Sequence, residues 1–199
     1  FEGISGKNLR KEIDDGIRLD VSVFVRGAEE FQDDITSLHL NGVDGIISTI
    51  LHNDIKPENI LLGHVGRLVL IDFGAASEPH IGTYEGTEGY VAPDLRLGKD
   101  RKYNVDGDLY ALSISLHEWL LGCRPGVESS SVDKVPTMLV EWLRKGCSSN
   151  SADRYTSAQE MLSALQLAIV EPEQIETPEV GAKVEATFFV GEEIESKQL

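Results

Sequence analysis

The chain has 199 residues, of which 41% are hydrophobic, enough apolar sequence for one domain with a buried core and too much for wholesale disorder. The formal net charge of −16 gives an acidic surface, which repels nucleic acid and anionic membranes, so we expect neither as a partner. Apolar runs such as Leu68 to Ile71 are far too short to span a bilayer. The two cysteines form neither a disulfide framework nor a metal set, which is typical of a cytoplasmic protein.

The first part of the chain predicts two helices of unequal length. Residues 8–14 are expected to form a short helix that ends near Gly16. From Asp20 to about His39, apolar side chains recur at spacings of three and four, which is typical of an amphipathic helix with one buried face.

Polar residues with the chemistry of phosphoryl transfer follow this helix. They comprise a carboxylate at Asp54, an ammonium at Lys56, a carboxamide at Asn59 and a second carboxylate at Asp72. Transfer of phosphate from a nucleotide requires a carboxylate to orient the attacking hydroxyl, a cation to neutralise the moving phosphoryl group and oxygen ligands for magnesium. The spacing therefore predicts a phosphotransferase site.

Two short apolar runs separate Asn59 from Asp72. Residues 60–62 and 68–71 are expected to form strands, and the connection between them has hairpin length and contains glycine. This hairpin would bring Asn59 and Asp72 close to one metal ion.

The second half of the chain predicts one loop and three helices. The segment from Ala75 to Pro93 is polar and rich in glycine and threonine, and we expect it to be a loop. The three helices are predicted at residues 105–121, 135–145 and 157–169, the last opening with a capping box at Ser157 and Glu160. The first of them should end at Gly122 and is apolar nearly all round, so it is expected to be the buried spine of the domain.

Taken together, these motifs resemble those of protein kinases. Residues 52–59 resemble the catalytic loop H-R-D-x-K-x-x-N, residues 72–74 the D-F-G metal loop, and residues 86–94 the segment G-T-x-x-Y-x-A-P-E with Asp94 as its last residue. Residues 106–112 and 153–155 are similar to later segments of the family.

The resemblance covers residues 1–170 and implies an α+β, mostly α fold. This is the C-terminal lobe of a protein kinase, a helical bundle with a short β-hairpin beside the catalytic loop. Residues 171–199 contain eight glutamates, and we interpret them as an acidic linker or the start of another domain.

The resemblance also implies a role for each motif residue. Asp54 would act as the catalytic base on the substrate hydroxyl, and Lys56 would contact the γ-phosphate of ATP. Asn59 and Asp72 would hold Mg²⁺, which prefers oxygen ligands. Thr87 would brace the pair formed by Asp54 and Lys56.

ATP and Mg²⁺ are thus the implied cofactors. Residues 1–6 resemble the hinge between the two kinase lobes, where the carbonyl of Glu2 and the N–H group of Ile4 would contact adenine. Leu61 would form the floor of the adenine pocket, while Lys56 and Asp72 would reach the phosphates and their metal.

Other matching residues are expected to be structural. His52 would pack under the metal loop, and Asp108 would accept hydrogen bonds from the catalytic-loop backbone. Asp94 and Arg154 would form a buried ion pair, strained or bridged by water because Asp is shorter than the family's glutamate. The remaining histidines have no ligand spacing and are expected at the surface: His39, His64, His80 and His117.

Two features depart from the family pattern. Asn53 stands where many kinases have an arginine that binds a phosphate on the activation loop, so we do not expect switching by phosphorylation of that loop. Residues 44–50 are additional to the usual turn before the catalytic loop. Either the preceding helix is longer or a surface insertion lies below the site.

The sequence predicts the catalytic lobe of a serine/threonine protein kinase, since tyrosine kinases usually lack a lysine equivalent to Lys56. Its expected partners are a protein substrate with Ser or Thr and a small lobe, supplied by the upstream chain or another polypeptide, because no glycine-rich loop or Val-Ala-Ile-Lys strand is present. The alternative is a kinase-like module that binds partners without catalysis. A third reading, a small-molecule phosphotransferase of the aminoglycoside-kinase type, is disfavoured by residues 86–94.

Overall fold

The computed structural model describes residues 7–16, 21–40, 49–63, 67–82, 86–96, 101–129 and 131–169. The predicted linker at 171–199 lies outside them. In chain order the elements are β1 (Lys7–Asn8), α1 (Leu9–Asp14), α2 (Val21–Leu40), β2 (Ile60–Leu62), β3 (Leu68–Leu70), β4 (His80–Gly82), α3 (Pro93–Arg96), β5 (Arg101–Tyr103), α4 (Val105–Leu121), α5 (Thr137–Gly146) and α6 (Ala158–Ile169). Among these helices, none is long and apolar enough to cross a membrane.

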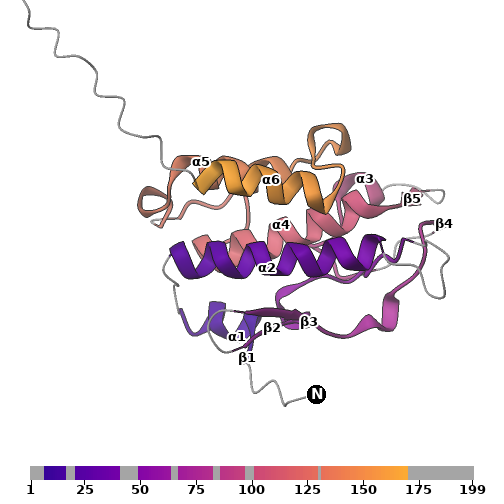
Figure 1. The fold of residues 1–199 in the computed structure, drawn as a ribbon, viewed down its shortest axis with the longest axis horizontal. Coiled ribbons are helices and arrows are strands. Elements are labelled where there is room, and N and C mark those ends of the chain that lie inside the picture. The colour runs from indigo at the N-terminus through magenta and orange to yellow at the C-terminus, as the bar shows by residue number, and fades with distance from the viewer. Residues whose placement is uncertain are drawn as a thin grey trace, which may run out of the picture.

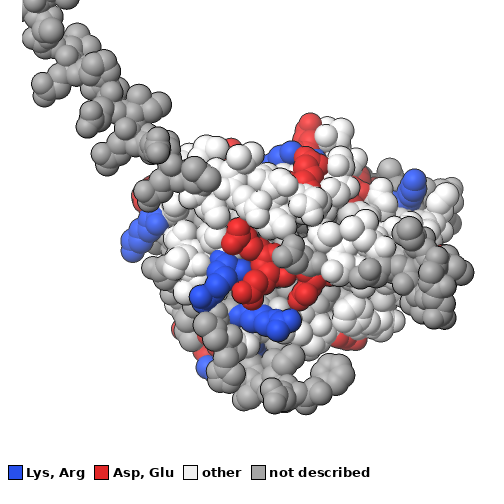
Figure 2. All heavy atoms as spheres, in the orientation of Figure 1, with Lys and Arg blue, Asp and Glu red and all other residues white. Residues whose placement is uncertain are grey.

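The elements are stacked around α2 and α4 (Figure 1). Helices α5 and α6 pack on one side of this central pair, and α1 with the β1–β3 sheet lies on the other. On the face that Figure 2 shows, acidic and basic side chains gather together over α2. The predicted mostly helical α+β architecture is confirmed.

The buried spine predicted between residues 105 and 121 is helix α4. Its side chains are buried nearly all round, and Trp119 is 1% exposed and lies 5.2 Å, centroid to centroid, from the ring of Phe24 in α2. The helix ends at Gly122, whose φ of 74° lies in the left-handed region that glycine adopts without strain.

The predicted hairpin is also present. Strands β2 and β3 pair antiparallel with Ile60 opposite Leu70, and β1 adds a third strand on the outer edge of β2, which sequence patterning did not reveal because it has only two residues.

The prediction of a loop from 75 to 93 is wrong in part. Strand β4 lies within this segment and pairs with β5, with the ring of His80 stacked on that of Tyr103 at 4.7 Å. The segment lacks the alternation typical of a strand, so its conformation depends on a partner about twenty residues away along the chain, which local pattern does not report.

The start of α6 carries the predicted cap with one difference. The N–H group of Glu160 donates to Ser157 Oγ at 3.1 Å. The Glu160 carboxylate, however, accepts from the N–H and hydroxyl groups of Thr156, both at 2.8 Å, so the return bond of the capping box reaches one residue further upstream.

Candidate active site

Asp54, Lys56 and Thr87 form a closed triangle of hydrogen bonds. Lys56 Nζ donates to Asp54 Oδ2 and to Thr87 Oγ1, both at 2.7 Å, and Thr87 Oγ1 donates to Asp54 Oδ1 at 2.7 Å. The side chains of Asp54 and Lys56 are only 18% and 20% exposed. The structure thus brings together three residues from two segments that the sequence assigned to one site.

The surroundings of Asp54 keep it ionised. Burial alone would raise the pKa of this carboxyl, but the hydrogen bonds from Lys56 and Thr87, the charge of Lys56 and the hydrogen bond from Asn59 outweigh burial and lower the pKa. Asp54 is therefore a carboxylate at neutral pH, which is the form that accepts a hydrogen bond from a substrate hydroxyl.

Asn59 is oriented by the same carboxylate. Its Nδ2 donates to the carbonyl oxygen of Asp54 at 2.9 Å and to Asp54 Oδ2 at 3.1 Å, which leaves the amide oxygen as the end of the side chain available to a metal ion. The backbone carbonyl of Asn59 accepts from the N–H group of Ile71 at 2.9 Å. This bond joins the two loops next to Asp72.

Asp72 is exposed and follows directly after the hairpin. Its Oδ1 accepts from the N–H group of Gly74 at 3.4 Å. One carboxylate and one amide oxygen are the hard ligands that Mg²⁺ takes when substrate phosphates and water supply the others. The residues therefore fit the ion, although no group of three His, Cys, Asp or Glu side chains suited to a metal occurs in the described ranges.

Two backbone features make these approaches possible. Asn53 and Asp72 both have φ of 64°, a left-handed conformation that Asn and Asp tolerate better than other side chains. Gly86 has φ of 108°, and a Cβ placed there would lie 2.8 Å from the carbonyl oxygen of Asn53. Glycine at this position lets the segment carrying Thr87 pass close to the catalytic loop.

The chain matches the protein kinase domain family over residues 4–174. It belongs to the protein kinase family. Serine/threonine-protein kinase PknD of Mycobacterium tuberculosis is 32% identical over 166 residues, which cover 70% of this chain and 24% of that protein. PknD of Chlamydia trachomatis is 31% identical over 162 residues, covering 59% and 17% of the two chains.

A solved structure, that of the Cydia pomonella granulovirus kinase PK-1, has the same fold as this kinase chain. The TM-score is 0.63 at 20% identity, over 74% of this chain and 59% of that one. This chain spans about a quarter or less of the length of these curated relatives.

The loop of residues 52–59 is held in place by Asp108 in α4. This side chain is 3% exposed and accepts from the N–H groups of His52 at 2.7 Å and Asn53 at 2.9 Å. His39 Nε2 lies 3.1 Å from the same carboxylate and is 5% exposed, so the prediction that His39 is a surface residue is wrong. The helical spacing in α2 could have predicted that His39 is buried, because His39 follows buried Ile35 by four residues and so lies on the same helix face.

The other histidines differ from one another. His52 is fully buried, donates from Nε2 to the carbonyl of Ile71 at 3.1 Å and meets the ring of Phe73 edge-on at 4.8 Å, so the predicted packing under the metal loop is present. His117 is half-buried rather than exposed, and burial lowers its pKa. His80 is likewise half-buried rather than exposed, and His64 lies outside the described residues.

Asn53, which stands where many kinases have an arginine, forms neutral hydrogen bonds to the activation segment. Its Nδ2 donates to the carbonyl of Ala75 at 2.8 Å and to Ser77 Oγ at 2.9 Å. Ser77 also exchanges two backbone hydrogen bonds with Leu51, at 2.7 and 3.0 Å. The start of the activation segment is therefore held by the unphosphorylated chain itself.

Arg154 forms the predicted buried ion pair, but with two carboxylates. Its guanidinium group binds Asp94 directly, so no bridging water is needed, and Nη1 donates to Asp106 Oδ2 at 3.0 Å. Burial raises the pKa of Asp106 despite the charge of Arg154. The contribution of Asp106 was missed because the family motif assigned Arg154 one partner only.

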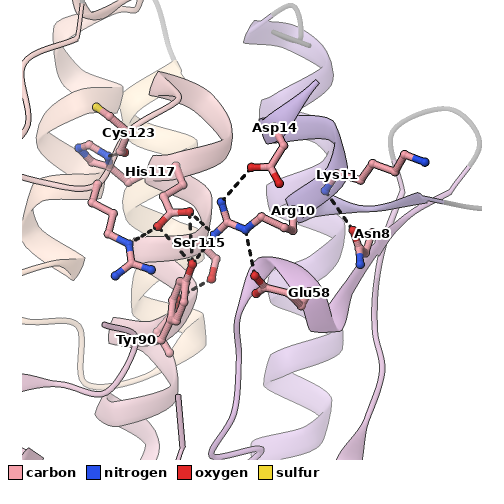
Figure 3. Close-up of polar contacts among 12 residues, drawn as sticks. Asn8, Arg10, Lys11, Asp14, Glu58, Tyr90, Ser115, His117 and Cys123 are labelled. Atoms are coloured by element: carbon pink, nitrogen blue, oxygen red, sulfur yellow. Dashed lines mark hydrogen bonds and ion pairs between the residues drawn. The ribbon is translucent and has the colours of Figure 1, made fainter. Parts of the chain in front are cut away.

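A second ion-pair network was not predicted at all (Figure 3). Buried Glu118 in α4 binds Arg10 Nη2 at 2.5 Å and Arg124 Nε at 2.6 Å, and accepts from the hydroxyl of Tyr90 at 3.2 Å. Arg10 Nε reaches Glu58 of the catalytic loop at 2.9 Å. The available signal was a glutamate among the apolar residues Leu116, Trp119 and Leu120 of α4, since a buried charge requires a partner.

The remaining predicted site residues are described only in part. Leu61 lies in β2, half-buried. Glu2 and Ile4 lie outside the described residues, as do 44–48 of the additional stretch, while α2 ends at Leu40.

Proposed function

We propose that this chain is the catalytic lobe of a serine/threonine protein kinase. When completed by a small lobe, it transfers the γ-phosphoryl group of ATP to a Ser or Thr hydroxyl of a protein substrate. The observation that carries the proposal is the closed triangle of Asp54, Lys56 and Thr87 at 2.7 Å, with Asn59 bound to the same carboxylate. A scaffold protein has no physical need for four polar side chains arranged in this way.

Each residue has a separate task in the proposed reaction. Asp54 orients the substrate hydroxyl and takes its proton as the oxygen attacks the γ-phosphorus and the bond to the ADP oxygen breaks. Lys56 offsets the negative charge of the transferring group. Thr87 positions both through its two hydrogen bonds. Bound Mg²⁺, held by the Asn59 oxygen and the Asp72 carboxylate, would neutralise the phosphate oxygens.

The need for a small lobe is supported by the surface beside the metal loop. Phe73 is 48% exposed and Asp72 is also exposed, although both belong to the proposed nucleotide cleft. A lobe from the upstream chain or another polypeptide would cover this surface. Glu2, Ile4 and Leu61 are our proposed adenine contacts.

The test is transfer of labelled γ-phosphate from Mg²⁺·ATP by a protein extended upstream to include the small lobe, assayed on peptide libraries with Ser, Thr or Tyr acceptors. We expect labelling of Ser and Thr, and at least a thousand-fold loss in Asp54→Asn, on the order of the rate that positioning and proton transfer supply. The matched control is Asp133→Asn, an exposed carboxylate in the 3-10 turn Val132–Lys134. Absence of transfer by the unmodified protein would instead support the binding module.

A further inference from the structure

An apolar groove lies at the end of the bundle where α2 and α5 begin and α6 stops. Its volume is about 700 Å³, and none of the proposed catalytic residues lines it. Its apolar lining includes Val21, Val25, Pro136, Met138, Leu139 and Ile169.

Several of these side chains are uncovered. Met138 is 59% exposed and Ile169 is 37% exposed, whereas Leu139 is 1% exposed and anchors the floor to the core. Exposed apolar side chains that cluster around a concave site favour binding of an apolar segment.

We propose that this groove binds the apolar run of the same chain at residues 184–190. This run contains Phe188 and Phe189, the only aromatic residues after the last helix, and glutamates dominate the sequence around it. Two phenyl rings are suitable anchors for a groove of this size, because each aromatic ring buries about 150–250 Å² of surface.

The connection from the groove to this run favours binding within one molecule. Ile169 both lines the groove and ends α6, and residues 170–183 separate it from Val184. A chain of that length can connect sites roughly 20 Å apart and gives an effective concentration of about millimolar, so even a weak apolar contact would form.

Charge disfavours the other occupants. A second copy of a chain with net charge −16 would bring two strongly acidic surfaces together, and an anionic membrane would repel the chain in the same way. Binding in cis brings no second chain of charge −16 to this surface.

Hydrogen exchange of the full chain tests the proposal. In the double variant Phe188→Ser, Phe189→Ser, we expect amides of residues 21–29 and 137–139 to exchange at least several-fold faster than in the unmodified chain. The matched control, Ile175→Ser, removes an apolar side chain of the same tail outside the proposed run and should leave exchange unchanged. Equal exchange in the double variant and the unmodified chain would overturn the proposal.

A crosslinking experiment distinguishes the occupant. With Cys123 and Cys147 replaced by serine, Met138→Cys combined with Val190→Cys should form an intramolecular disulfide on oxidation. Leu40→Cys combined with Val190→Cys is the control, because Leu40 is 62% exposed at the far end of α2. Equal crosslinking of the two pairs, or a predominantly dimeric product from the first, would contradict binding in cis.

Discussion

The carboxylate of Asp94 binds the guanidinium group of Arg154 directly, although the two residues lie 60 positions apart in the chain. The Arg154 side chain is 0% exposed and also holds Asp106. One arginine thus ties the end of the activation segment to α4 and to the loop before α6.

Replacing Arg154 with methionine should strongly destabilise the protein. Two partly buried carboxylates would lose their cation, so we expect the free energy of unfolding to fall by about 3–5 kcal/mol, measured by chemical denaturation at neutral pH. The loss should shrink at acid pH, because protonation then neutralises the stranded carboxylates.

Two variants control this experiment. Arg144→Met removes an arginine that is 67% exposed and paired with Glu141, and it should cost less than about 0.5 kcal/mol. Replacing Arg154, Asp94 and Asp106 together by apolar residues should cost less than Arg154→Met alone. An unchanged melting temperature in Arg154→Met would mean that the contact contributes nothing in solution.

Asp54→Asn and Asp72→Asn should both abolish most activity of the protein with its small lobe, but for different reasons. Asp54 acts on the substrate hydroxyl, so kcat should fall while nucleotide affinity persists. Asp72 acts through the metal, so nucleotide affinity should fall as well, and added Mg²⁺ should recover part of it. Calorimetric titration of Mg²⁺·ATP separates the two, and equal affinities would contradict the assignment of Asp72.

Asn53→Gly should loosen the start of the activation segment. Glycine keeps the positive φ but removes the two amide hydrogen bonds to Ala75 and Ser77, for an expected cost of about 1–3 kcal/mol. Asn53→Ala should cost roughly 1 kcal/mol more, because alanine is strained in the left-handed region. Denaturation of both variants measures the difference.

We also expect activity to be independent of phosphorylation at this segment. In the protein with its small lobe, phosphatase treatment should leave kcat unchanged, because Asn53 offers no charge to a phosphate. Strong activation by phosphorylation of the activation segment would show that another basic residue performs that task.

Glu160 should produce a pH-dependent contribution to stability. Hydrogen bonds from Lys145 and Thr156 lower its pKa from 4.5 to about 2, so its contribution is present above about pH 4.5 and is lost as the pH falls towards 2. The side chain is 39% exposed, so solvent screening limits the effect to less than about 1 kcal/mol. We expect the difference in unfolding free energy between the unmodified chain and Glu160→Gln to become smaller as the pH is lowered from 4.5 to 2. In a Lys145→Met background this change with pH should be smaller, because one of the hydrogen bonds that lower the pKa of Glu160 is lost.

The 199-residue chain alone should have little kinase activity. Positioning provides most of the acceleration in phosphoryl transfer. Because Phe73 and Asp72 are exposed, this chain covers only one side of the proposed nucleotide site and would position the nucleotide poorly. Robust ATP-dependent labelling of a peptide by this chain, lost in Asp54→Ala, would contradict this expectation.

The sequence predicted the parts of this molecule that depend on local pattern. The helix through Phe24 and Phe31, the hairpin of β2 and β3 and the buried helix α4 follow from spacing and apolar content, since these set which face is buried. The resemblance to protein kinases, rather than spacing, placed Asp54 and Thr87 in one site, and their side chains form a hydrogen bond.

The features that it missed depend on partners distant in sequence. Strand β4 exists because of β5, and Glu118 is stabilised by Arg10, which lies 108 positions away. Neither pairing has a periodic signal, because each uses one or a few residues from unrelated segments. His39 is different, since its spacing from Ile35 places it on the buried face of α2, and it was expected at the surface only because it has no ligand spacing.

Two contacts at the end of α2 fix the position of the catalytic loop, whatever the length of the connection between them. The carbonyl of Leu38 accepts from the N–H group of Ile50 at 3.4 Å, and His39 binds Asp108, which in turn holds the backbone at His52. Both ends of the connection are thereby fastened to the core independently of the residues between them. Positions 41–48 are consequently a favourable place to insert a fluorescent reporter or an affinity tag, since lengthening a connection whose ends are already fixed adds little entropic cost.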